Sequence, residues 1–151
     1  MSKYKKQSHV VWKCDYYIVW TPKYRFRILE GVIKELVEKD IRMLSEWKGC
    51  EVDELNVQKD HIHLVISIPP KVSVSEYIGT IKGKLAIKLL KTYPNLKKKP
   101  YWGNHFWSRG YFVNTIGINE EVIKRYVKYQ EEEEKRDENN SKGFDLFSNE
   151  R

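Results

Sequence analysis

Apolar residues recur along the chain with two different periods, which predict an alternation of strands and helices. The segments 12–20, 61–68 and 106–116 are rich in aromatic and β-branched residues or alternate with a period of two, as strands do. Residues 50–58 show the same tendency more weakly. The strand predicted for 106–116 is expected to bend at Gly110. The first ten residues are expected to form a loose arm.

Helical spacing marks the segments between these strands. Apolar residues recur at intervals of three and four from 31 to 48, and Gly49 provides a stop. Ser73 and Glu76 form the S-x-x-E pattern of a capping box, so a second helix is expected to begin there. Within it, the spacing of Gly79 and Gly83 predicts either a close approach of another backbone or a simple packing contact.

The third helix is expected to change character along its length. Asn119 is a suitable N-cap, and Glu120 and Glu121 place carboxylates in the first turn, where the helix dipole favours them. Beyond Gln130 the sequence becomes almost wholly polar. Residues 131–151 are therefore expected to fray into a solvated tail.

The order strand, helix, strand, strand, helix, strand, helix predicts an α+β fold. Four antiparallel strands covered on one face by two helices form a ferredoxin-like or RRM-like sandwich. The final helix is an addition to this fold, and the open face of the sheet is its expected docking place. The length of 151 residues fits a single domain, residues 1–151, with 131–151 as its polar acidic tail.

Charge is unevenly distributed along the chain. The tail 131–151 contains eight acidic and four basic residues, so it carries −4 of the total of +7, and residues 1–130 carry +11. A basic body indicates a polyanionic partner, most simply nucleic acid, although a merely solubilising surface would look the same.

Other compositional signals point to the cytoplasm. Cys14 and Cys50 form no CxxC pair, so neither a disulfide framework nor a zinc ribbon is expected. The basic start lacks the apolar stretch of a secretory signal. No run approaches the roughly 18 apolar residues of a membrane span, so no membrane partner is expected.

Two histidines are the first candidates for chemistry. His61 and His63 are separated by one residue on a predicted strand, so their rings project to the same side and can reach one divalent ion. Asp60 is placed to orient one ring or to act as an outer partner. The pair by itself favours a purely structural role over a metal site.

The last helix carries the second candidate group. Tyr126 and Gln130 are four residues apart, so both side chains project to one side of the helix. A tyrosine nucleophile beside an amide ligand makes chemical sense there. Tyr126 could instead be a half-buried aromatic and Gln130 a rim residue. Tyr129 lies near the same face, and spacing alone does not decide which tyrosine would react.

Five stretches of the chain, in this order, resemble the insertion-sequence-200 type of transposase, the small TnpA enzymes with an HUH motif and a single catalytic tyrosine. The stretches are 14–25, 59–70, 73–84, 106–117 and 122–130. The resemblance implies that Tyr126 is the nucleophile and that His61, His63 and Gln130 bind Mg²⁺ or Mn²⁺. It also implies cleavage and rejoining of single-stranded DNA through a 5′-phosphotyrosine intermediate.

The resemblance further implies partners and a location. Family members act on single-stranded DNA with a hairpin near the element ends, in the prokaryotic cytoplasm. They are homodimers, and their tyrosine helix can serve the histidine pair of the other subunit.

Basic and aromatic residues supply candidate DNA contacts. Trp102 and Trp107 are candidates for stacking on unpaired bases. The candidate phosphate-binding residues are Lys23, Arg25, Arg27, Lys82, Lys84 and Lys88.

Three other functions are compatible with parts of this pattern. A replication initiator or relaxase would share the histidine pair and the tyrosine, but the short chain leaves no room for a helicase domain. A domesticated, repeat-associated transposase would differ only in its genomic context. A non-catalytic RRM-like module would need aromatic residues on the central strands, where Val65 and Ser67 stand beside the histidines.

Overall fold

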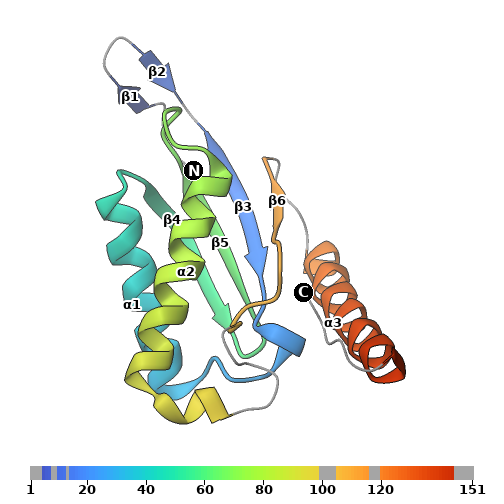
Figure 1. Ribbon diagram of the computed structural model, residues 1–151. Helices are drawn as coiled ribbons and strands as arrows, with labels where there is room; N and C mark the ends of the chain where they lie inside the picture. The colour runs from blue at the N-terminus through green and yellow to red at the C-terminus, as the bar shows by residue number, and fades with distance from the viewer. Residues whose placement is uncertain (1–4, 8–9, 13, 99–104, 116–119, 145–151) are drawn as a thin grey trace.

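The computed structural model describes residues 5–7, 10–12, 14–98, 105–115 and 120–144. Its main sheet has four antiparallel strands in the order β4-β5-β3-β6. These are β3 (Asp15–Trp20), β4 (Glu51–Gln58), β5 (His61–Ser67) and β6 (Phe112–Asn114). The helices α1 (Gly31–Trp47) and α2 (Val74–Thr92) cover one face of the sheet (Figure 1). This arrangement confirms the expected ferredoxin-like α+β fold.

Alternation along β5 decides what the sheet buries. Ile62, Leu64 and Ile66 face the helices and are fully buried. The core on this side is completed by apolar residues from β3, α1 and α2, namely Ile18, Trp20, Val37, Ile41, Tyr77, Ile81, Leu85 and Leu89. Each buried aliphatic side chain contributes roughly 1.5–3 kcal/mol by leaving water, so this layer fixes which way β5 faces.

Polar contacts hold α1 against α2. The hydroxyl groups of Ser45 and Tyr77 lie 2.6 Å apart in the core. Burial raises the pKa of Tyr77, so this phenol keeps its proton. Nearer the surface, the Lys88 ammonium lies 3.2 Å from the Asp40 carboxylate. The two helices therefore form one rigid layer behind the sheet.

The N-terminal part of the chain differs from the expectation. The segment 12–20 is not one strand, because β2 (Val10–Trp12) is separate from β3. β2 pairs instead with β1 (Lys5–Gln7) in a two-stranded antiparallel sheet with Gln7 opposite Val10. The predicted loose arm is therefore wrong for these residues, since a short local hairpin satisfies their backbone groups.

The segment 106–111 is not a strand, although the bend at Gly110 is confirmed by its φ of +76°. Its backbone pairs with the turn after β3: Ser108 N donates to Thr21 O over 2.9 Å. The Lys82 ammonium on α2 donates to Ser108 O over 2.9 Å and to Gly110 O over 2.7 Å. These contacts replace the ladder that a full strand would have made.

The third helix, α3 (Glu120–Phe144), continues far beyond Gln130, so the predicted fraying there is wrong. Two features account for the extension. Glu131 pairs with Lys135 one turn later, at 3.1 Å. Glu134 is only 5% exposed because this part of α3 packs against the segment that follows β3. Asn119 and residues 145–151 lie outside the described residues.

The expectation that Gly79 and Gly83 allow a close contact on α2 is wrong. Neither backbone approach nor packing explains them, because a Cβ built at either position meets no heavy atom within 4 Å. Both are exposed on α2. Of the helices within the described ranges, none has the length and apolar composition needed to span a lipid bilayer.

Replacing Ser73 by Ala should destabilise the protein by about 1 kcal/mol. Ser73 Oγ accepts a hydrogen bond from Glu76 N over 3.0 Å, which is the cap predicted from the sequence. The comparison is urea unfolding of Ser73→Ala against Ser73→Asp, which retains an acceptor. Equal losses in both variants would show that the cap does not contribute.

Lys82 should make stability depend on pH in the alkaline range. Burial lowers its pKa from 10.5 to about 8, and the Glu134 carboxylate opposes this shift. Between these values the unfolded chain binds a proton that the folded chain does not. The cost of charging buried Lys82 is therefore present below about pH 8 and is relieved as the pH rises to 10.5.

Wild type should accordingly gain stability relative to Lys82→Met as the pH rises through this window, by on the order of 3 kcal/mol. Urea unfolding of both proteins across the window measures the difference. Parallel pH curves would show that Lys82 titrates normally in the folded state.

Candidate active site

A row of side chains crosses the open face of the sheet. The strand register pairs His63 with Asn56 on β4 and with Val19 on β3, and Val19 in turn with Phe112 on β6. Because Ile62 and Leu64 on β5 face the helices, His61 and His63 project from the other face. The sequence prediction that both histidines share this face is confirmed.

α3 docks at the other end of this row. Val127 packs against Val19, and the exposed fractions of these two side chains are 2% and 0%. The rings of Phe112 and Tyr126 extend the contact, with centroids 5.5 Å apart. Val19 therefore lies between His63 and the residues that seat the tyrosine helix. The expected docking of the extra helix on the open face is confirmed.

His61 is oriented by its neighbour. Its Nδ1 lies 3.0 Å from Oδ1 of the buried Asp60. The other carboxylate oxygen of Asp60 accepts a hydrogen bond from Arg25 Nε over 2.8 Å. Burial alone would raise the pKa of Asp60, but the hydrogen bonds from Arg25 and His61 lower it overall. An ionised carboxylate at Nδ1 favours the tautomer whose Nε2 lone pair can bind a cation.

His63 is fixed by an aromatic neighbour on the next strand. The ring of Tyr17 stacks on the His63 ring with centroids 5.9 Å apart and an interplanar angle of 29°. The two imidazoles therefore have separate supports, one from a carboxylate and one from a ring.

Tyr126 and Gln130 contact each other directly. Gln130 Nε2 donates to Tyr126 Oη over 2.7 Å and to Arg109 O over 3.1 Å. The prediction that both side chains lie on one side of α3 is confirmed. The amide oxygen of Gln130 takes no part in these two bonds and remains the atom with which it could bind a cation. Tyr129, the alternative tyrosine, is 56% exposed.

The Tyr126 phenol is half-buried, and this has an electrostatic consequence. Burial raises its pKa most, and the Glu134 and Tyr129 side chains raise it further, while the hydrogen bond from Gln130 works in the other direction. The phenol is therefore protonated at neutral pH, and its reaction would require loss of that proton.

The donor atoms suit a divalent cation. Two imidazoles and an amide oxygen form a mixed nitrogen and oxygen set, which Mn²⁺ accepts more readily than Mg²⁺ does. Within the described ranges, no group of three or more His, Cys, Asp and Glu side chains is placed to hold a metal ion.

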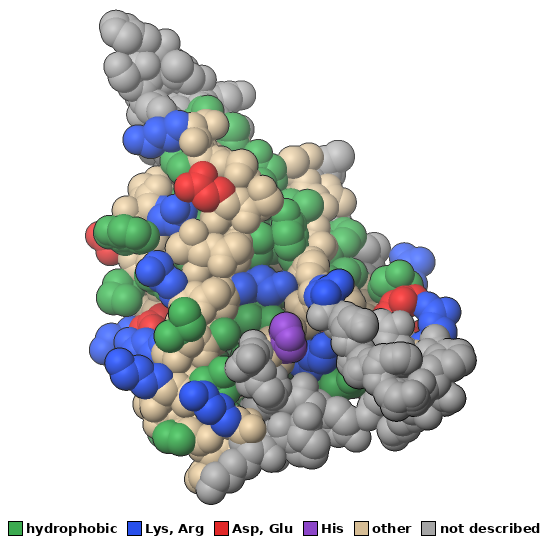
Figure 2. Space-filling view, viewed as in Figure 1, with side chains coloured by type: hydrophobic (Ala, Val, Ile, Leu, Met, Phe, Trp, Pro, Cys, Tyr) green, Lys and Arg blue, Asp and Glu red, His purple; other side chains and the backbone are tan. Residues whose placement is uncertain are grey.

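The six candidate phosphate-binding residues lie in different environments. Lys23 is buried, Arg25 is engaged with two carboxylates, and Lys82 is held by two carbonyl groups. Lys88 pairs with Asp40 and the Lys84 ammonium lies 5.9 Å from the centroid of the Trp47 ring, whereas Arg27 is exposed. Lys and Arg side chains are spread over the outer surface of the molecule on the side of α1 and α2 (Figure 2). Only some of these residues are thus free to meet a phosphate group without giving up an internal contact.

Trp107 does not have the exposure that base stacking needs. It is 7% exposed, and its Nε1 donates to Lys82 O over 3.0 Å. Trp102 lies outside the described residues.

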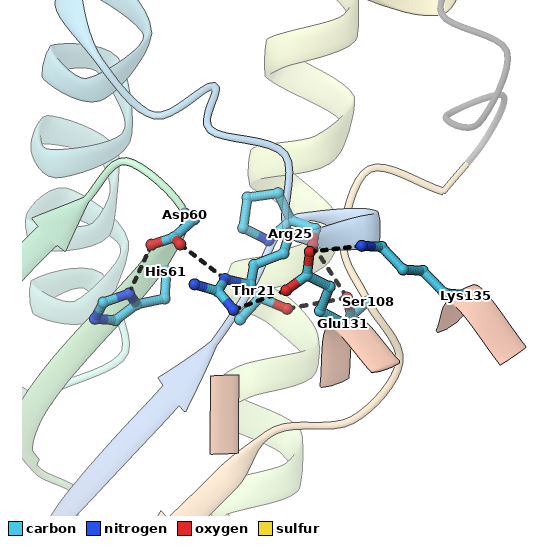
Figure 3. A network of polar contacts seen from close by, with 8 residues as sticks. Thr21, Arg25, Asp60, His61, Ser108, Glu131 and Lys135 are labelled. Carbon is cyan, nitrogen blue, oxygen red and sulfur yellow. Dashed lines mark hydrogen bonds and ion pairs between the residues drawn. The ribbon is translucent and has the colours of Figure 1, made fainter. Parts of the chain in front are cut away.

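Sequence reasoning missed the contribution of Glu131. Its carboxylate lies 2.8 Å from Arg25 Nη1 and links α3 to the turn after β3 (Figure 3). The only sequence signal was its spacing of four from Lys135, which was hidden by the expectation of a solvated tail.

The chain has relatives of known type over most of its length. Residues 10–130 match the family of IS200-like transposases. The transposase for insertion sequence element IS200 of Salmonella typhimurium is 42% identical over 135 residues, which cover 89% of this chain and 88% of the relative. The ISDra2 transposase TnpA of Deinococcus radiodurans is 30% identical over 131 residues, covering 86% of this chain and 93% of the relative.

Two solved structures share the fold. A crystal structure of a Deinococcus radiodurans R1 protein assigned as a transposase superposes with a TM-score of 0.74 at 27% identity, covering 83% of this chain and 97% of the other. A REP-associated tyrosine transposase bound to a REP hairpin has a TM-score of 0.53 at 15% identity, covering 85% and 70%, and supports the fold alone. By its match over residues 10–130 and its identity to IS200 transposases, the chain belongs to the IS200-like transposase family.

Proposed function

We propose that this transposase cleaves and rejoins single-stranded DNA at insertion-sequence ends, with Tyr126 as nucleophile and a divalent cation bound by His61, His63 and Gln130. The observation that carries the proposal is the hydrogen bond that the Gln130 amide donates to Tyr126 Oη. It occurs on a helix that is seated on the same sheet face as the histidine pair.

The cation would be Mg²⁺ or Mn²⁺, which when bound supplies Lewis-acid polarisation of the scissile phosphate. His61 would contribute Nε2, since Asp60 occupies the Nδ1 side of its ring. Gln130 would contribute its amide oxygen. The roles of these three residues are those that the family resemblance implies.

The chain's own groups account for the strand exchange. Tyr126 Oη loses its proton to solvent and attacks the phosphorus, the bond from phosphorus to the 3′ oxygen breaks, and that oxygen takes up a proton from solvent. The Gln130 amide, which donates to Oη, stabilises the negative charge that develops there. The product is a 5′-phosphotyrosine and a free 3′-hydroxyl. A 3′-hydroxyl can later attack this phosphorus and expel Tyr126, so rejoining requires no nucleotide cofactor.

The substrate we propose is single-stranded DNA with a hairpin near each element end. The net charge of +11 on residues 1–130 supports a polyanionic substrate, and the hairpin is what the family resemblance implies. We also propose a homodimer, on the family resemblance. α3 packs on its own sheet here, which is the arrangement that would assemble each site within one subunit.

Tyr126→Phe should abolish covalent capture of DNA. With single-stranded DNA from the element ends and Mn²⁺, wild type should form an adduct that survives denaturation, and the variant should lose it by at least about three orders of magnitude. Tyr129→Phe, a change of the same kind on the exposed side of α3, should retain it. An adduct that persists in Tyr126→Phe and is lost in Tyr129→Phe would move the nucleophile to Tyr129.

Metal binding should separate this enzyme from a non-catalytic nucleic-acid-binding module. Calorimetric titration of the protein without DNA should give stoichiometric Mn²⁺ binding, and His61→Ala or His63→Ala should weaken it by about 100-fold or more. His105→Ala, at an exposed histidine remote from the pair in sequence, is the control. Unchanged binding in both site variants would place the metal elsewhere, and no binding by wild type would favour the binding module.

A further inference from the structure

Arg25 joins the tyrosine helix to the histidine pair. It closes the short 3₁₀ segment η1 (Lys23–Arg25), which follows β3. Its Nε donates to Asp60 Oδ2 and its Nη1 to Glu131 Oε1, both over 2.8 Å (Figure 3). A guanidinium is planar and rigid, so two carboxylates bound at different edges are held at a fixed mutual angle.

Each carboxylate is also held on its far side. Asp60 uses its other oxygen for His61 Nδ1, at 3.0 Å. Glu131 uses its other oxygen for Lys135 Nζ, at 3.1 Å. Because Glu131 directly follows Gln130, the sequence of contacts from His61 through Asp60 and Arg25 ends beside one of the proposed ligands. Four side chains thus connect β5 with α3.

The backbone of η1 is shaped to aim Arg25 between these partners. Tyr24 and Arg25 both have a φ of +58°, in the left-handed region that residues with a Cβ seldom occupy. Such conformations persist where surrounding contacts hold them. One such contact comes from α3, because Tyr24 N donates to a carboxylate oxygen of Glu134. α3 therefore binds η1 through Glu131 and Glu134 together.

We propose that Arg25 is a positioning residue that sets the tyrosine helix relative to the histidine pair by binding Asp60 and Glu131 at once. The inference rests on the proposed function of Tyr126 and His61. These two bonds use two of the five N–H groups of the guanidinium, so the positioning role is compatible with phosphate binding, the role of Arg25 expected from the sequence.

Two variants test the contacts of Arg25 with Asp60 and Glu131. Arg25→Lys keeps the charge but cannot bind both carboxylates in the same geometry. Glu131→Ala removes the contact to α3 and leaves Asp60 in place. Glu132→Ala is the matched control, because it removes a neighbouring exposed carboxylate from the same helix. Glu131→Gln retains an oxygen for Nη1 and serves as the conservative variant.

The first measurement uses the protein without metal or DNA. The ¹⁵N chemical shifts of the His61 ring, recorded where the imidazole is neutral, report which nitrogen carries the proton. Wild type should show predominantly Nδ1–H, and Arg25→Lys should shift the ring toward a mixture of tautomers. The exposed His105 provides an internal reference. Unchanged His61 shifts in Arg25→Lys would overturn the Asp60 half of the proposal.

The second measurement is the rate of adduct formation at saturating Mn²⁺ and DNA, well below the unfolding temperature. Glu131→Ala should slow it by about 10- to 100-fold with unchanged DNA affinity, since small displacements of a reacting group cost this much. Glu131→Gln should recover part of the rate, and Glu132→Ala should match wild type. Equal rates in Glu131→Ala and Glu132→Ala would overturn the proposal that the contact of Arg25 with Glu131 positions α3.

Failure of the proposed function would look different. If wild type formed no adduct, the proposed chemistry of Tyr126 would be refuted. The effect of the Arg25 contacts on catalysis would be refuted with it. The His61 shifts would still decide whether Arg25 orients that ring through Asp60.

Discussion

The pairing of β3 with β5 is the constraint on which the rest of the site depends. It sets Val19 beside His63 and Trp20 beside Ile62. A slip of one residue would bring the imidazoles into the apolar layer under α1 and α2 and expose the isoleucines. The burial of Ile62, Leu64 and Ile66 excludes that slip, so the position of the histidines follows from the packing of residues that take no part in chemistry.

The docking of α3 is of a different kind. Among the described side chains, a small apolar contact built around Val127 and Val19 attaches α3 to the sheet. Polar contacts of the described residues also hold α3, through η1 and the Gln130 amide. Contacts between charged groups are directional but are weakened by water and salt. The polar contacts that help to fix Tyr126 relative to the histidines are therefore more sensitive to solution conditions than the core.

The sequence was most informative where one period dominates. The bounds of α1, β4 and β5 agree with the expectation to within one residue, because buried layers impose their period on the chain. The side shared by Tyr126 and Gln130 was also predictable, since it follows from helix geometry alone. What could not be predicted depends on distant partners. In the sequence, Glu131 and Glu134 resemble solvated tail residues, because their partners Arg25 and Tyr24 are far away along the chain. The left-handed backbone of η1 was not predictable either, since no glycine stands at those positions.

Three successive carbonyl groups precede β6, and each accepts a hydrogen bond from a neighbouring helix. The carbonyl groups of Ser108 and Gly110 accept from the Lys82 ammonium on α2. The carbonyl group of Arg109, between them, accepts from the Gln130 amide on α3. The oxygen atoms that support the proposed ligand thus belong to the main chain, so the side chain at 109 is free to vary while the support stays the same. Comparison of homologous sequences would then show this part of the site only indirectly, through Lys82 and through Gly110, whose φ of +76° favours glycine.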